Sequence, residues 1–445
     1  MDKDVFDLLE KLDNHGYKSY IVGGCLRDIL LGIRPNDFDI TTNARPSQVK
    51  EVFREYKIFD YGIKYGTITV EYRDRLYEIT TFRSEGTYSD NRRPDRVLFL
   101  DSIDDDLARR DFTINAMAMD KSYNIYDPFN GIRDLKNKII RVCGDADKRI
   151  EEDALRILRA IRFATRFKFY LDEELFDAIS LNRNLLKNIA KERIFSEICK
   201  MITYDNPSYG FLLMEETGIL DILFPSLRKT VGFVQKSPWH DRNLFDHLLC
   251  VMDNVPNDLA IRFAAIFHDI AKPLTLKIDG DGTGHFLGHD ALGATMAEDI
   301  LKYYKGPKAL IEKVSILIKE HMKVQEVMTD KALRRQIKRV GRENILDLYE
   351  LLYADCVCTR YDQDGSFILN RKKRIEELLD EKEMKKEKFL EINGYDLIEL
   401  GFHGKIIGQI LKYAENLVLS DTSLNKKEIL LEKIKNNFIS GDRNG

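Results

Sequence analysis

Two aspartates, Asp37 and Asp39, lie one residue apart and shortly after a pair of glycines. Residues 36–40 are predicted to form a strand, and side chains alternate along a strand with a period of two. Both carboxylates would therefore point to one side, whereas Phe38 and Ile40 would point to the other side and enter a core. Neighbouring carboxylates repel each other unless a cation lies between them, and Mg²⁺ commonly binds one or two carboxylates together with substrate phosphates. The pair is therefore a candidate magnesium site.

The glycine pair, Gly23-Gly24, ends a short apolar run at residues 20–22 that predicts a strand. Because glycine has no Cβ atom, the backbone can approach a phosphate closely at this point. Arg27-Asp28 follows, and then the two aspartates. An isolated Asp-x-Asp sequence is usually a solvated turn, but in this order and together with the glycines it predicts metal-dependent nucleotidyl transfer.

In the usual two-metal arrangement the ions lie about 3.5–4 Å apart. One ion activates a terminal hydroxyl, and the other binds the triphosphate and the leaving pyrophosphate. Such a site often includes a third carboxylate, for which Glu78, on a neighbouring predicted strand, is the candidate. The alternative is an ordinary surface glutamate at the edge of a sheet, and the sequence favours neither.

The elements that must position these residues change in character along the chain. Up to about residue 140, alternating segments at 66–72 and 76–82 predict paired strands around a polar turn at 73–74. Beyond that point apolar residues recur at helical spacing almost to the end. We therefore expect an α+β fold, in which an α/β domain is followed by an elongated, all-helical region.

A basic segment at residues 152–162 is predicted to be a helix in which Asp153 and Arg156, three residues apart, share one face. An ordinary salt bridge is the alternative. The arginines of this helix exceed what one acid requires, however, and predict a face directed at phosphates; they are Arg156, Arg159, Arg162 and Arg166. The pair Arg109-Arg110 is a second candidate, because guanidinium forms bidentate bonds with phosphate.

In their order along the chain, the motifs GGxxRD, DxD, RRDFTINA and EDxxR resemble those of class II tRNA nucleotidyltransferases, the CCA-adding enzymes and their poly(A) polymerase relatives. The resemblance covers residues 1 to about 230. It implies a catalytic head that binds Mg²⁺ through Asp37 and Asp39, and a neck helix that recognises the incoming base. The residues that it implies contact the nucleotide are Gly24, Arg27, Arg110, Asp153, Arg156, Arg159 and Arg162.

One acid and one arginine can select cytosine and adenine without a nucleic-acid template. Both bases present an amino donor beside a ring-nitrogen acceptor. A carboxylate only accepts and a guanidinium only donates hydrogen bonds, so Asp153 would bind the amino group and Arg156 the ring nitrogen. Uracil and guanine would place a carbonyl against the carboxylate, and a site that leaves a buried polar group unpaired rejects such a ligand strongly.

The resemblance leaves the added nucleotides open. The polar segment 83–94 resembles the flexible loop that family members use to add the final A, which disfavours a CC-only enzyme; an ordinary surface loop is the alternative. We expect addition of C, C and A to tRNA from CTP and ATP. An A-only enzyme and a poly(A) polymerase are the alternatives within the family.

Six of the eight histidines lie between His240 and His321. The series H…HD…H…H…D resembles the metal site of HD-type phosphohydrolases, and some long CCA-adding enzymes are similar in carrying an HD domain. The resemblance implies a metal site at His247, His268, Asp269 and Asp355. Imidazole ligands favour a transition metal, which can activate water against a phosphoester such as a cyclic or terminal phosphate of RNA. The alternatives are a relic domain without turnover and, for His285 and His321 singly, ordinary core histidines.

The composition is that of a globular protein, because 44% of the 445 residues are hydrophobic and 32% are charged. A formal net charge of −4 argues against a general nucleic-acid binder, and we expect no DNA partner. No apolar run approaches the ~20 residues of a membrane span, so we expect no membrane partner. The acidic N-terminus lacks the apolar core of a signal peptide, and six cysteines in so long a chain are typical of reduced proteins. We therefore expect a cytoplasmic location.

These observations predict four domains. They are a nucleotidyltransferase head at 1–140, a helical neck with the nucleotide-recognising helix at 141–228, an HD-type helical body at 229–375, and a helical tail that contacts tRNA at 376–445. A rival from another class is an HD phosphohydrolase whose head only binds RNA. The intact Asp-x-Asp sequence argues against this rival, because a binding relic has no need of metal ligands.

Overall fold

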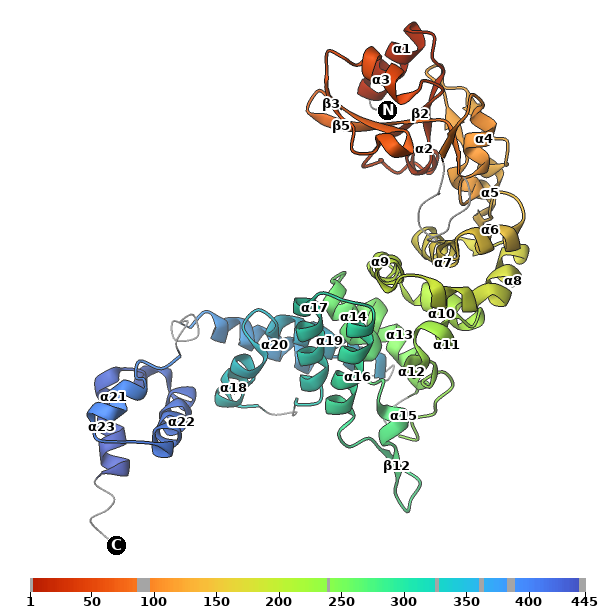
Figure 1. The fold of residues 1–445 in the computed structure, drawn as a ribbon. Helices are drawn as coiled ribbons and strands as arrows, with labels where there is room; N and C mark the ends of the chain where they lie inside the picture. The colour runs from red at the N-terminus through yellow and green to blue at the C-terminus, as the bar shows by residue number, and fades with distance from the viewer. Residues whose placement is uncertain are drawn as a thin grey trace. The chain divides into compact units, whose positions relative to one another are not determined.

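The computed structural model describes residues 3–85, 97–237, 241–324, 328–359, 364–381 and 389–439. The chain forms two compact units, Met1–Arg228 and Lys229–Gly445. The first unit combines a sheet with helices, and the second is almost wholly helical (Figure 1). The expected fold class, an α/β part followed by helices, is confirmed. No helix within the described ranges is both long and apolar enough to cross a bilayer.

A seven-stranded sheet with the order β3-β4-β5-β2-β1-β8-β9 forms the centre of the first unit. Its strands are β1 (Ser19–Val22), β2 (Asp39–Thr42), β3 (Lys57–Phe59), β4 (Thr67–Tyr72), β5 (Arg75–Thr81), β8 (Ala118–Met119) and β9 (Ile125–Tyr126). Neighbours in this sheet are antiparallel except β2 and β5, which run parallel. Helices α1 (Lys3–Asn14) and α3 (Pro46–Val52) lie beside each other next to the sheet (Figure 1), and α2 (Gly24–Leu30) follows β1 directly.

Strands β4 and β5 form the hairpin that the alternating pattern predicts. Every second residue of β4 is buried, namely Ile68, Val70 and Tyr72, and these side chains contribute to the core. The turn residues Arg73 and Asp74 have positive φ angles of 49° and 63°, as a two-residue hairpin turn of type I′ requires. The sequence pattern was informative here because strands and turn are adjacent in the chain.

The strand predicted at 36–40 begins later than expected. β2 starts at Asp39, which pairs with Val22, the last residue of β1. Beyond Val22 the chain turns into α2, so residues before Asp39 have no β1 backbone to pair with. Asp37 therefore precedes the strand. Phe38 is only half-buried and borders the same recess as the two aspartates, so its predicted place in the core is wrong.

Short helices and two strand pairs complete the first unit. They are α4 (Ile103–Ala108), α5 (Gly131–Asn137), α6 (Ala146–Glu152), α7 (Leu155–Phe167), α8 (Glu173–Asn182), α9 (Lys191–Ile202), α10 (Ser208–Glu216), α11 (Ile219–Leu223) and α12 (Pro225–Arg228), with β6 (Arg83–Glu85) paired to β7 (Val97–Phe99) and β10 (Ile139–Ile140) to β11 (Tyr170–Leu171).

The single helix predicted over 152–162 is wrong, because the chain breaks between α6 and α7. Asp153 is extended, with φ −147° and ψ 98°, and its Oδ1 accepts a hydrogen bond from the Leu155 N–H at 3.1 Å. Aspartate is a favoured residue for satisfying the free N–H groups at the start of a helix. Asp153 thus ends α6 and accepts a hydrogen bond from the first residue of α7, and it does not share a helix face with Arg156.

The second unit is built from helices and one short hairpin. Its elements are α13 (Leu244–Asn254), α14 (Leu259–Phe267), α15 (Lys272–Thr275), β12 (Lys277–Ile278), β13 (Gly284–His285), α16 (His289–Tyr303), α17 (Lys308–Glu320), α18 (Asp330–Val340), α19 (Ile345–Thr359), α20 (Ser366–Leu379), α21 (Gly394–Glu399), α22 (Lys405–Ser420) and α23 (Lys427–Phe438). Helices α13, α14, α17 and α19 pack against one another, and α16 packs on α17. A separate small core joins α21, α22 and α23 through residues such as Leu397, Ile410 and Leu430.

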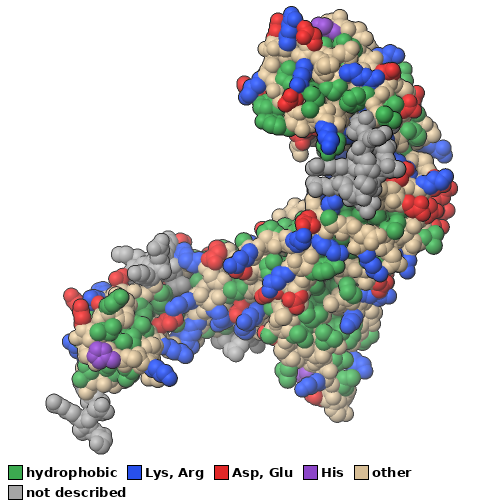
Figure 2. All heavy atoms as spheres, viewed as in Figure 1, with side chains coloured by type: hydrophobic (Ala, Val, Ile, Leu, Met, Phe, Trp, Pro, Cys, Tyr) green, Lys and Arg blue, Asp and Glu red, His purple; other side chains and the backbone are tan. Residues whose placement is uncertain are grey.

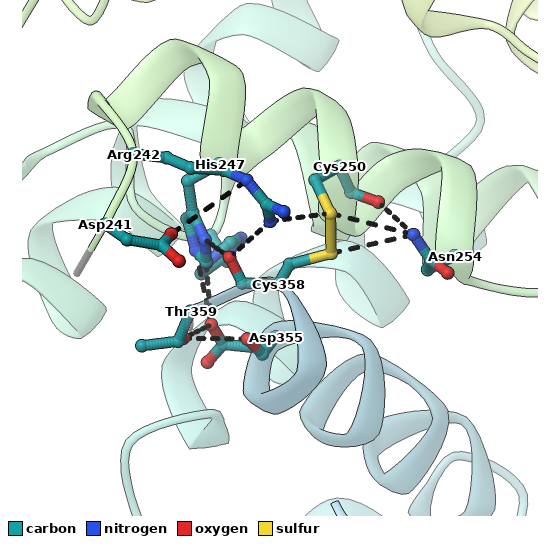
Figure 3. The surroundings of a disulfide bond; sticks show 9 residues. Asp241, Arg242, His247, Cys250, Asn254, Asp355, Cys358 and Thr359 are labelled. Atoms are coloured by element: carbon teal, nitrogen blue, oxygen red, sulfur yellow. Dashed lines mark hydrogen bonds and ion pairs between the residues drawn. A yellow bond between two sulfur atoms is a disulfide. The ribbon is translucent and has the colours of Figure 1, made fainter. Parts of the chain in front are cut away.

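A disulfide bond joins α13 to α19 in this unit. Cys250 and Cys358 are 108 residues apart in the chain, and their Cα atoms lie 5.8 Å apart (Figure 3). The expectation that the cysteines are reduced is therefore wrong for this pair. The packing of two helices that are distant in the chain brings the sulfur atoms together, and sequence spacing does not indicate this pairing.

Replacing both Cys250 and Cys358 by serine should lower the free energy of unfolding of the second unit by about 2–4 kcal/mol, because the bond closes a long loop and restricts the unfolded chain. Urea unfolding without reductant, followed by circular dichroism, measures the loss. Cys356→Ser removes a nearby free cysteine and should change little. Equal stability of the double variant and the unmodified chain would contradict a formed bond.

Candidate functional site

The three carboxylates predicted for the catalytic site lie together in the first unit. Asp39 on β2 and Glu78 on β5 are direct partners in the parallel strand pair. Asp37, just before β2, borders the same recess of about 560 Å³ as these two acids. The parallel register therefore brings together side chains that are 39 residues apart in the chain.

Restricted hydration in this recess raises the pKa of both Asp39 and Glu78. For Asp39, the Arg110 guanidinium opposes the shift and the Asp37 carboxylate adds to it. For Glu78, both aspartates add to the shift. Asp37 thus disfavours ionisation of Asp39 and Glu78, Asp39 disfavours that of Glu78, and a divalent cation would offset this repulsion. The donors are carboxylate oxygens, which Mg²⁺ prefers, so these residues fit the predicted ion.

A larger cavity of about 700 Å³ adjoins the carboxylates, and Asp39 lines both spaces. Pockets for small molecules commonly span roughly 300–1,000 Å³, so a nucleotide fits by size. All the residues predicted to contact nucleotide line this cavity; they are Gly24, Arg27, Arg110, Asp153, Arg156, Arg159 and Arg162. Arg109 and Arg166 line it as well.

Gly23 is required at the turn between β1 and α2. Its φ of +74° is one that residues with a Cβ rarely adopt. A Cβ atom at this position would lie 2.8 Å from Nη1 of Arg110 and 3.7 Å from Oδ2 of Asp39. The backbone of Gly23 therefore lies close both to a cavity arginine, Arg110, and to a candidate metal ligand, Asp39.

The cavity arginines are held in place by acids from several segments. Arg27 donates to Oδ1 of Asp28 from Nε at 2.8 Å and from Nη2 at 2.7 Å, and its guanidinium lies over the ring of Phe167. The ion pairs of the α7 arginines are Arg156 with Glu152, Arg159 with Asp111, Arg162 with Glu197, and Arg166 with Asp28. The sequence near α7 suggested a surplus of arginines, but the fold supplies a separate partner to nearly every one.

Asp153 and Arg156 line the same cavity without pairing to each other. Oδ2 of Asp153 accepts from Arg193 of α9 at 3.1 Å, whereas Nη1 of Arg156 donates to Glu152 at 2.8 Å. Each carboxylate oxygen has two lone pairs, so Asp153 can accept further hydrogen bonds from a ligand. The prediction that Asp153 and Arg156 are neighbours on one helix face is therefore wrong, although both side chains line the same cavity.

Two further cavity residues, Asp111 and Asn115, were not singled out from the sequence. Asn115 accepts from Nη1 of Arg27 at 2.6 Å and donates to Asp111 at 3.0 Å. Burial would raise the pKa of Asp111, but the charge of Arg159, together with hydrogen bonds from Asn115 and Arg159, lowers this pKa to about 2. Both residues belong to the RRDFTINA motif, so the motif that pointed to Arg110 could have indicated them.

In the second unit, the four residues predicted to bind a transition metal also lie together. His247 is on α13, His268 and Asp269 directly follow α14, and Asp355 is on α19. Nε2 of His247 lies 3.2 Å from Oδ1 of Asp355 and 3.3 Å from Nε2 of His268. Nε2 of His268 lies 3.3 Å from Oδ2 of Asp269.

The disulfide lies one helical turn from this group (Figure 3). Cys250 follows His247 by three residues on α13, and Cys358 follows Asp355 by three residues on α19. The main-chain carbonyl of Cys358 also accepts from Nδ1 of His247 at 3.3 Å. The bond therefore connects the two helices that carry these side chains.

Burial would raise the pKa of Asp269 and of Asp355, yet both pKa values are lowered. The pKa of Asp269 is lowered mainly by the ammonium of Lys272, whose Nζ lies 2.6 Å from Oδ2 of Asp269, and next by His268. A hydrogen bond from His247 and the charge of His268 cause that of Asp355. Both carboxylates are thus ionised near neutral pH.

Two more histidines join this group. Nε2 of His289, at the start of α16, and Nε2 of His321, just after α17, lie 3.1 and 3.6 Å from Oδ1 of Asp269. His321, for which an ordinary core histidine was the alternative, is buried and belongs to this group. His285 is exposed and pairs with Asp279 at 2.7 Å, away from the group. His240 and residues 86–94 of the loop discussed above lie outside the described residues.

Comparison with known proteins decides the family. Residues 19–141 match the model of the poly A polymerase head domain, residues 168–230 that of the "Probable RNA and SrmB- binding site of polymerase A", and residues 289–434 that of tRNA nucleotidyltransferase domain 2. The CCA-adding enzyme of Ligilactobacillus salivarius is 33% identical over 435 residues, which is 97% of this chain and 96% of that protein. This chain belongs to the CCA-adding enzyme family.

Two further similarities agree with this assignment. The CCA-adding enzyme of Lactobacillus helveticus is 53% identical over 212 residues, which cover 48% of this chain and about half (53%) of that protein. The crystal structure of the Bacillus stearothermophilus CCA-adding enzyme in complex with CTP aligns with 100% of this chain and 99% of its own, with 27% identity and a TM-score of 0.75.

Asp111→Asn should weaken the dependence of stability on pH in acid. The pKa of Asp111 is about 2 in the folded chain and 3.8 ordinarily, so its stabilising effect is present above pH 4 and is lost as the pH falls toward 2. The difference in free energy of unfolding between the unmodified chain and the variant should decrease by roughly 1 kcal/mol from pH 5 to pH 3. Urea unfolding at each pH measures it, with Asp74→Asn, in the exposed hairpin turn, as the reference. A difference that stays constant would mean that Asp111 is not paired as described.

Proposed function

We propose that this chain adds C, C and A to the 3′ end of tRNA, using CTP and ATP with Mg²⁺ and no nucleic-acid template. The observation that carries the proposal is the position of Asp39, which lines both the three-carboxylate recess and the arginine-lined cavity. A metal site for the reacting groups thus adjoins a phosphate-binding space of nucleotide size. A family that is named for this activity, and a relative with bound CTP, support it.

The carboxylates Asp37, Asp39 and Glu78 would bind the metal ions. When bound, Mg²⁺ supplies charge neutralisation for the triphosphate and activation of the RNA 3′-hydroxyl. Arg110 lies beside the Gly23 turn, where the absence of a Cβ atom lets a phosphate approach the backbone. The arginine then neutralises phosphate oxygens through charge-assisted hydrogen bonds.

Base selection would fall to Asp153 and Arg156 at the α7 side of the cavity. Asp153 accepts from the amino group of cytosine or adenine, and Arg156 donates to the neighbouring ring nitrogen. Both groups are already oriented, Asp153 by Arg193 and Arg156 by Glu152, so they lose little freedom when a base binds. Arg27, Arg159 and Arg162 would contact the remainder of the nucleotide.

The tRNA substrate would be bound mainly through phosphates. On the face shown in Figure 2, basic and acidic side chains are mixed over both units, and no single large basic surface is seen on that face. Among the described residues of the first unit, arginines gather in the cavity instead. Because tRNA and nucleoside triphosphates are cytoplasmic molecules, the proposal includes a cytoplasmic location.

Removal of a metal ligand should abolish nucleotide addition. Asp39→Asn is expected to lower kcat/KM by more than about 100-fold, since bound metal supplies several kcal/mol of transition-state stabilisation. Glu78→Gln should also lower kcat/KM if Glu78 is the third ligand. Glu71→Gln is the matched control, because Glu71 lies on the other strand of the same hairpin and pairs with Lys57 at 2.8 Å.

The assay for these variants also decides between the family alternatives. It uses tRNAs that end before CC, after the first C and after CC, each with a single nucleoside triphosphate and Mg²⁺. CCA addition predicts incorporation of C on the first two substrates and of A on the third. Incorporation of A alone would indicate an A-only enzyme, and long A tracts a poly(A) polymerase. Absence of incorporation from every triphosphate would overturn the proposal.

Asp153→Ala should change which base is added more than it changes triphosphate affinity. Without the acceptor, UTP no longer meets a repulsive carboxylate, so discrimination against UTP and GTP should fall by at least about tenfold, the value of one lost hydrogen bond. Competition kinetics with mixed triphosphates measure the ratio of kcat/KM values. Unchanged discrimination would remove Asp153 from base selection.

A second candidate function, metal-dependent phosphohydrolysis, is favoured by the buried histidine and aspartate group of the second unit. We propose that His247, His268, Asp269 and Asp355 bind a transition metal and hydrolyse a cyclic or terminal phosphate at an RNA end. The nitrogen-rich donor set supports a transition metal and disfavours Mg²⁺. Hydrolysis by the full chain loaded with Mn²⁺, Co²⁺ or Ni²⁺, together with its loss in Asp269→Asn, would support this function.

A further inference from the structure

The disulfide bond of the second unit and a candidate metal ligand are connected through one main-chain carbonyl group. The carbonyl oxygen of Cys358 lies 3.3 Å from Nδ1 of His247 and 2.8 Å from Nη1 of Arg242 (Figure 3). A carbonyl only accepts hydrogen bonds, so Nδ1 of His247 carries the proton and Nε2 of the neutral ring presents its lone pair. The position of Cys358 therefore orients His247 toward the other candidate ligands.

The same two helices carry the sulfur atoms and two of the candidate ligands. Residues three apart share one face of a helix, so Cys250 lies on the face of α13 that carries His247. Cys358 likewise lies on the face of α19 that carries Asp355. Nε2 of His247 lies 3.2 Å from Oδ1 of Asp355. The bond between the two cysteines therefore restrains the separation of these two ligand atoms as well.

Both sulfur atoms have hydrogen-bond donors that stabilise a thiolate. Nη1 of Arg242 lies 3.1 Å from Sγ of Cys250. Nδ2 of Asn254 lies 3.7 Å from the same sulfur and 3.6 Å from Sγ of Cys358. A cation beside a cysteine lowers the pKa of its thiol, and a thiol of lower pKa leaves faster in thiol–disulfide exchange. These surroundings favour a bond that can open and close.

The other cysteines are poorer candidates for exchange. Burial raises the pKa of each of the other four thiols, those of Cys25, Cys143, Cys199 and Cys356. They stay protonated near neutral pH, whereas the reactive form is the thiolate. Within the pair, Cys358 is only 1% exposed and Cys250 is half-buried, so a reductant reaches the sulfur of Cys250.

We propose that Cys250 and Cys358 form a thiol–disulfide switch for the metal site of the second unit. With the bond formed, α13 and α19 hold His247 and Asp355 in place for a transition metal. With the bond reduced, Cys358 is released and the metal is bound more weakly. The inference rests on the proposed phosphohydrolase function and adds regulation by redox state to it. The reductant belongs to the dithiol class.

The reduction is a balanced exchange. One thiolate of the dithiol attacks Sγ of Cys250, forms a mixed disulfide and displaces Cys358 as a thiolate. The second thiolate of the dithiol attacks its own partner's sulfur in the mixed disulfide and displaces Cys250 as a thiolate beside Arg242. The dithiol is oxidised to a disulfide, and its two electrons reduce the bond between the cysteines. The two cysteine thiolates take up the protons that the dithiol lost.

The expected size of the effect follows from the hydrogen bond to His247. Removing a group that orients a metal-binding histidine through its other ring nitrogen typically lowers metal affinity by about 10–100-fold. Reduction should raise the Kd for Mn²⁺ by about tenfold, the lower end of this range, because α13 still packs against α19. By linkage, the bound ion stabilises the disulfide by the same factor. A tenfold preference corresponds to a midpoint potential that is lower by about 30 mV.

The experiment measures this linkage in the full-length chain. The chain is equilibrated without air in mixtures of reduced and oxidised dithiothreitol, its thiols are trapped by alkylation, and mass spectrometry gives the fraction of the Cys250–Cys358 disulfide. Saturating Mn²⁺ should lower the midpoint potential by about 30 mV. The Kd for Mn²⁺ is measured separately on the oxidised chain and on the chain reduced by a phosphine that is then removed.

Three variants separate a switch from a merely structural bond. Asp269→Asn removes a candidate metal ligand and keeps both cysteines, so its midpoint potential should not respond to Mn²⁺. The double variant Cys250→Ser with Cys358→Ser should bind Mn²⁺ with the Kd of the reduced chain. Cys356→Ser is the matched control and should keep both the shift and the difference in Kd. Circular dichroism verifies folding, and the chemically reduced chain gives the same comparison without any substitution.

The outcomes keep this inference apart from the function on which it rests. Equal Kd values in the two redox states, with a midpoint potential that Mn²⁺ does not move, would overturn the switch and leave the metal site. A midpoint potential that Mn²⁺ raises would mean that the ion prefers the reduced thiols, which also overturns the switch. Absence of the disulfide from the oxidised chain would overturn the switch alone. Retention of no Mn²⁺, Co²⁺ or Ni²⁺ by either form would overturn the metal site and the switch together.

Discussion

The parallel pairing of β2 with β5 is the constraint on which the candidate active site depends. It places Asp39 opposite Glu78, and the end of β1 at Val22 fixes where β2 begins. Restricted hydration raises the pKa of both acids, and the neighbouring carboxylates add to the shift: Asp37 for Asp39, and Asp39 and Asp37 for Glu78. Backbone pairing prevents Glu78 from moving away from Asp39. The sheet therefore maintains an electrostatic penalty that a bound cation offsets, and metal affinity follows from strand register rather than from flexible side chains.

The cavity beside these acids is lined by more arginines than acids, and many of these arginines form ion pairs. Its arginines are tied to acids that come from other segments, such as Asp111 for Arg159 and Glu197 for Arg162. Such pairs prevent the arginines from repelling one another when the cavity is empty. They also hold the guanidinium groups near the positions that phosphate oxygens would occupy, so little ordering remains to be done on binding.

Features that depend on neighbouring residues could be predicted from the sequence, and those that depend on distant partners could not. The β4–β5 hairpin followed from alternation, and the motifs located the side chains that line the cavity. The start of β2 depends on where β1 ends. The break at Asp153 depends on a hydrogen bond from the Leu155 N–H to the Asp153 side chain, and hydrophobic periodicity does not reveal that the helix is interrupted there. The Cys250–Cys358 bond and the place of His321 arise from helix packing across long stretches of chain.

The two candidate metal sites differ in donor chemistry, and this difference separates their ions. The first unit offers carboxylate oxygens in a partly enclosed recess, where Mg²⁺ could keep bound water and share substrate phosphates. The second unit offers four imidazole nitrogens in a buried space, which Mg²⁺ enters poorly because it gives up water reluctantly. Under the proposed functions, Mg²⁺ would bind the carboxylate site and a transition metal the imidazole site. One chain could then carry nucleotidyl transfer and phosphoester hydrolysis without either site competing for the metal of the other.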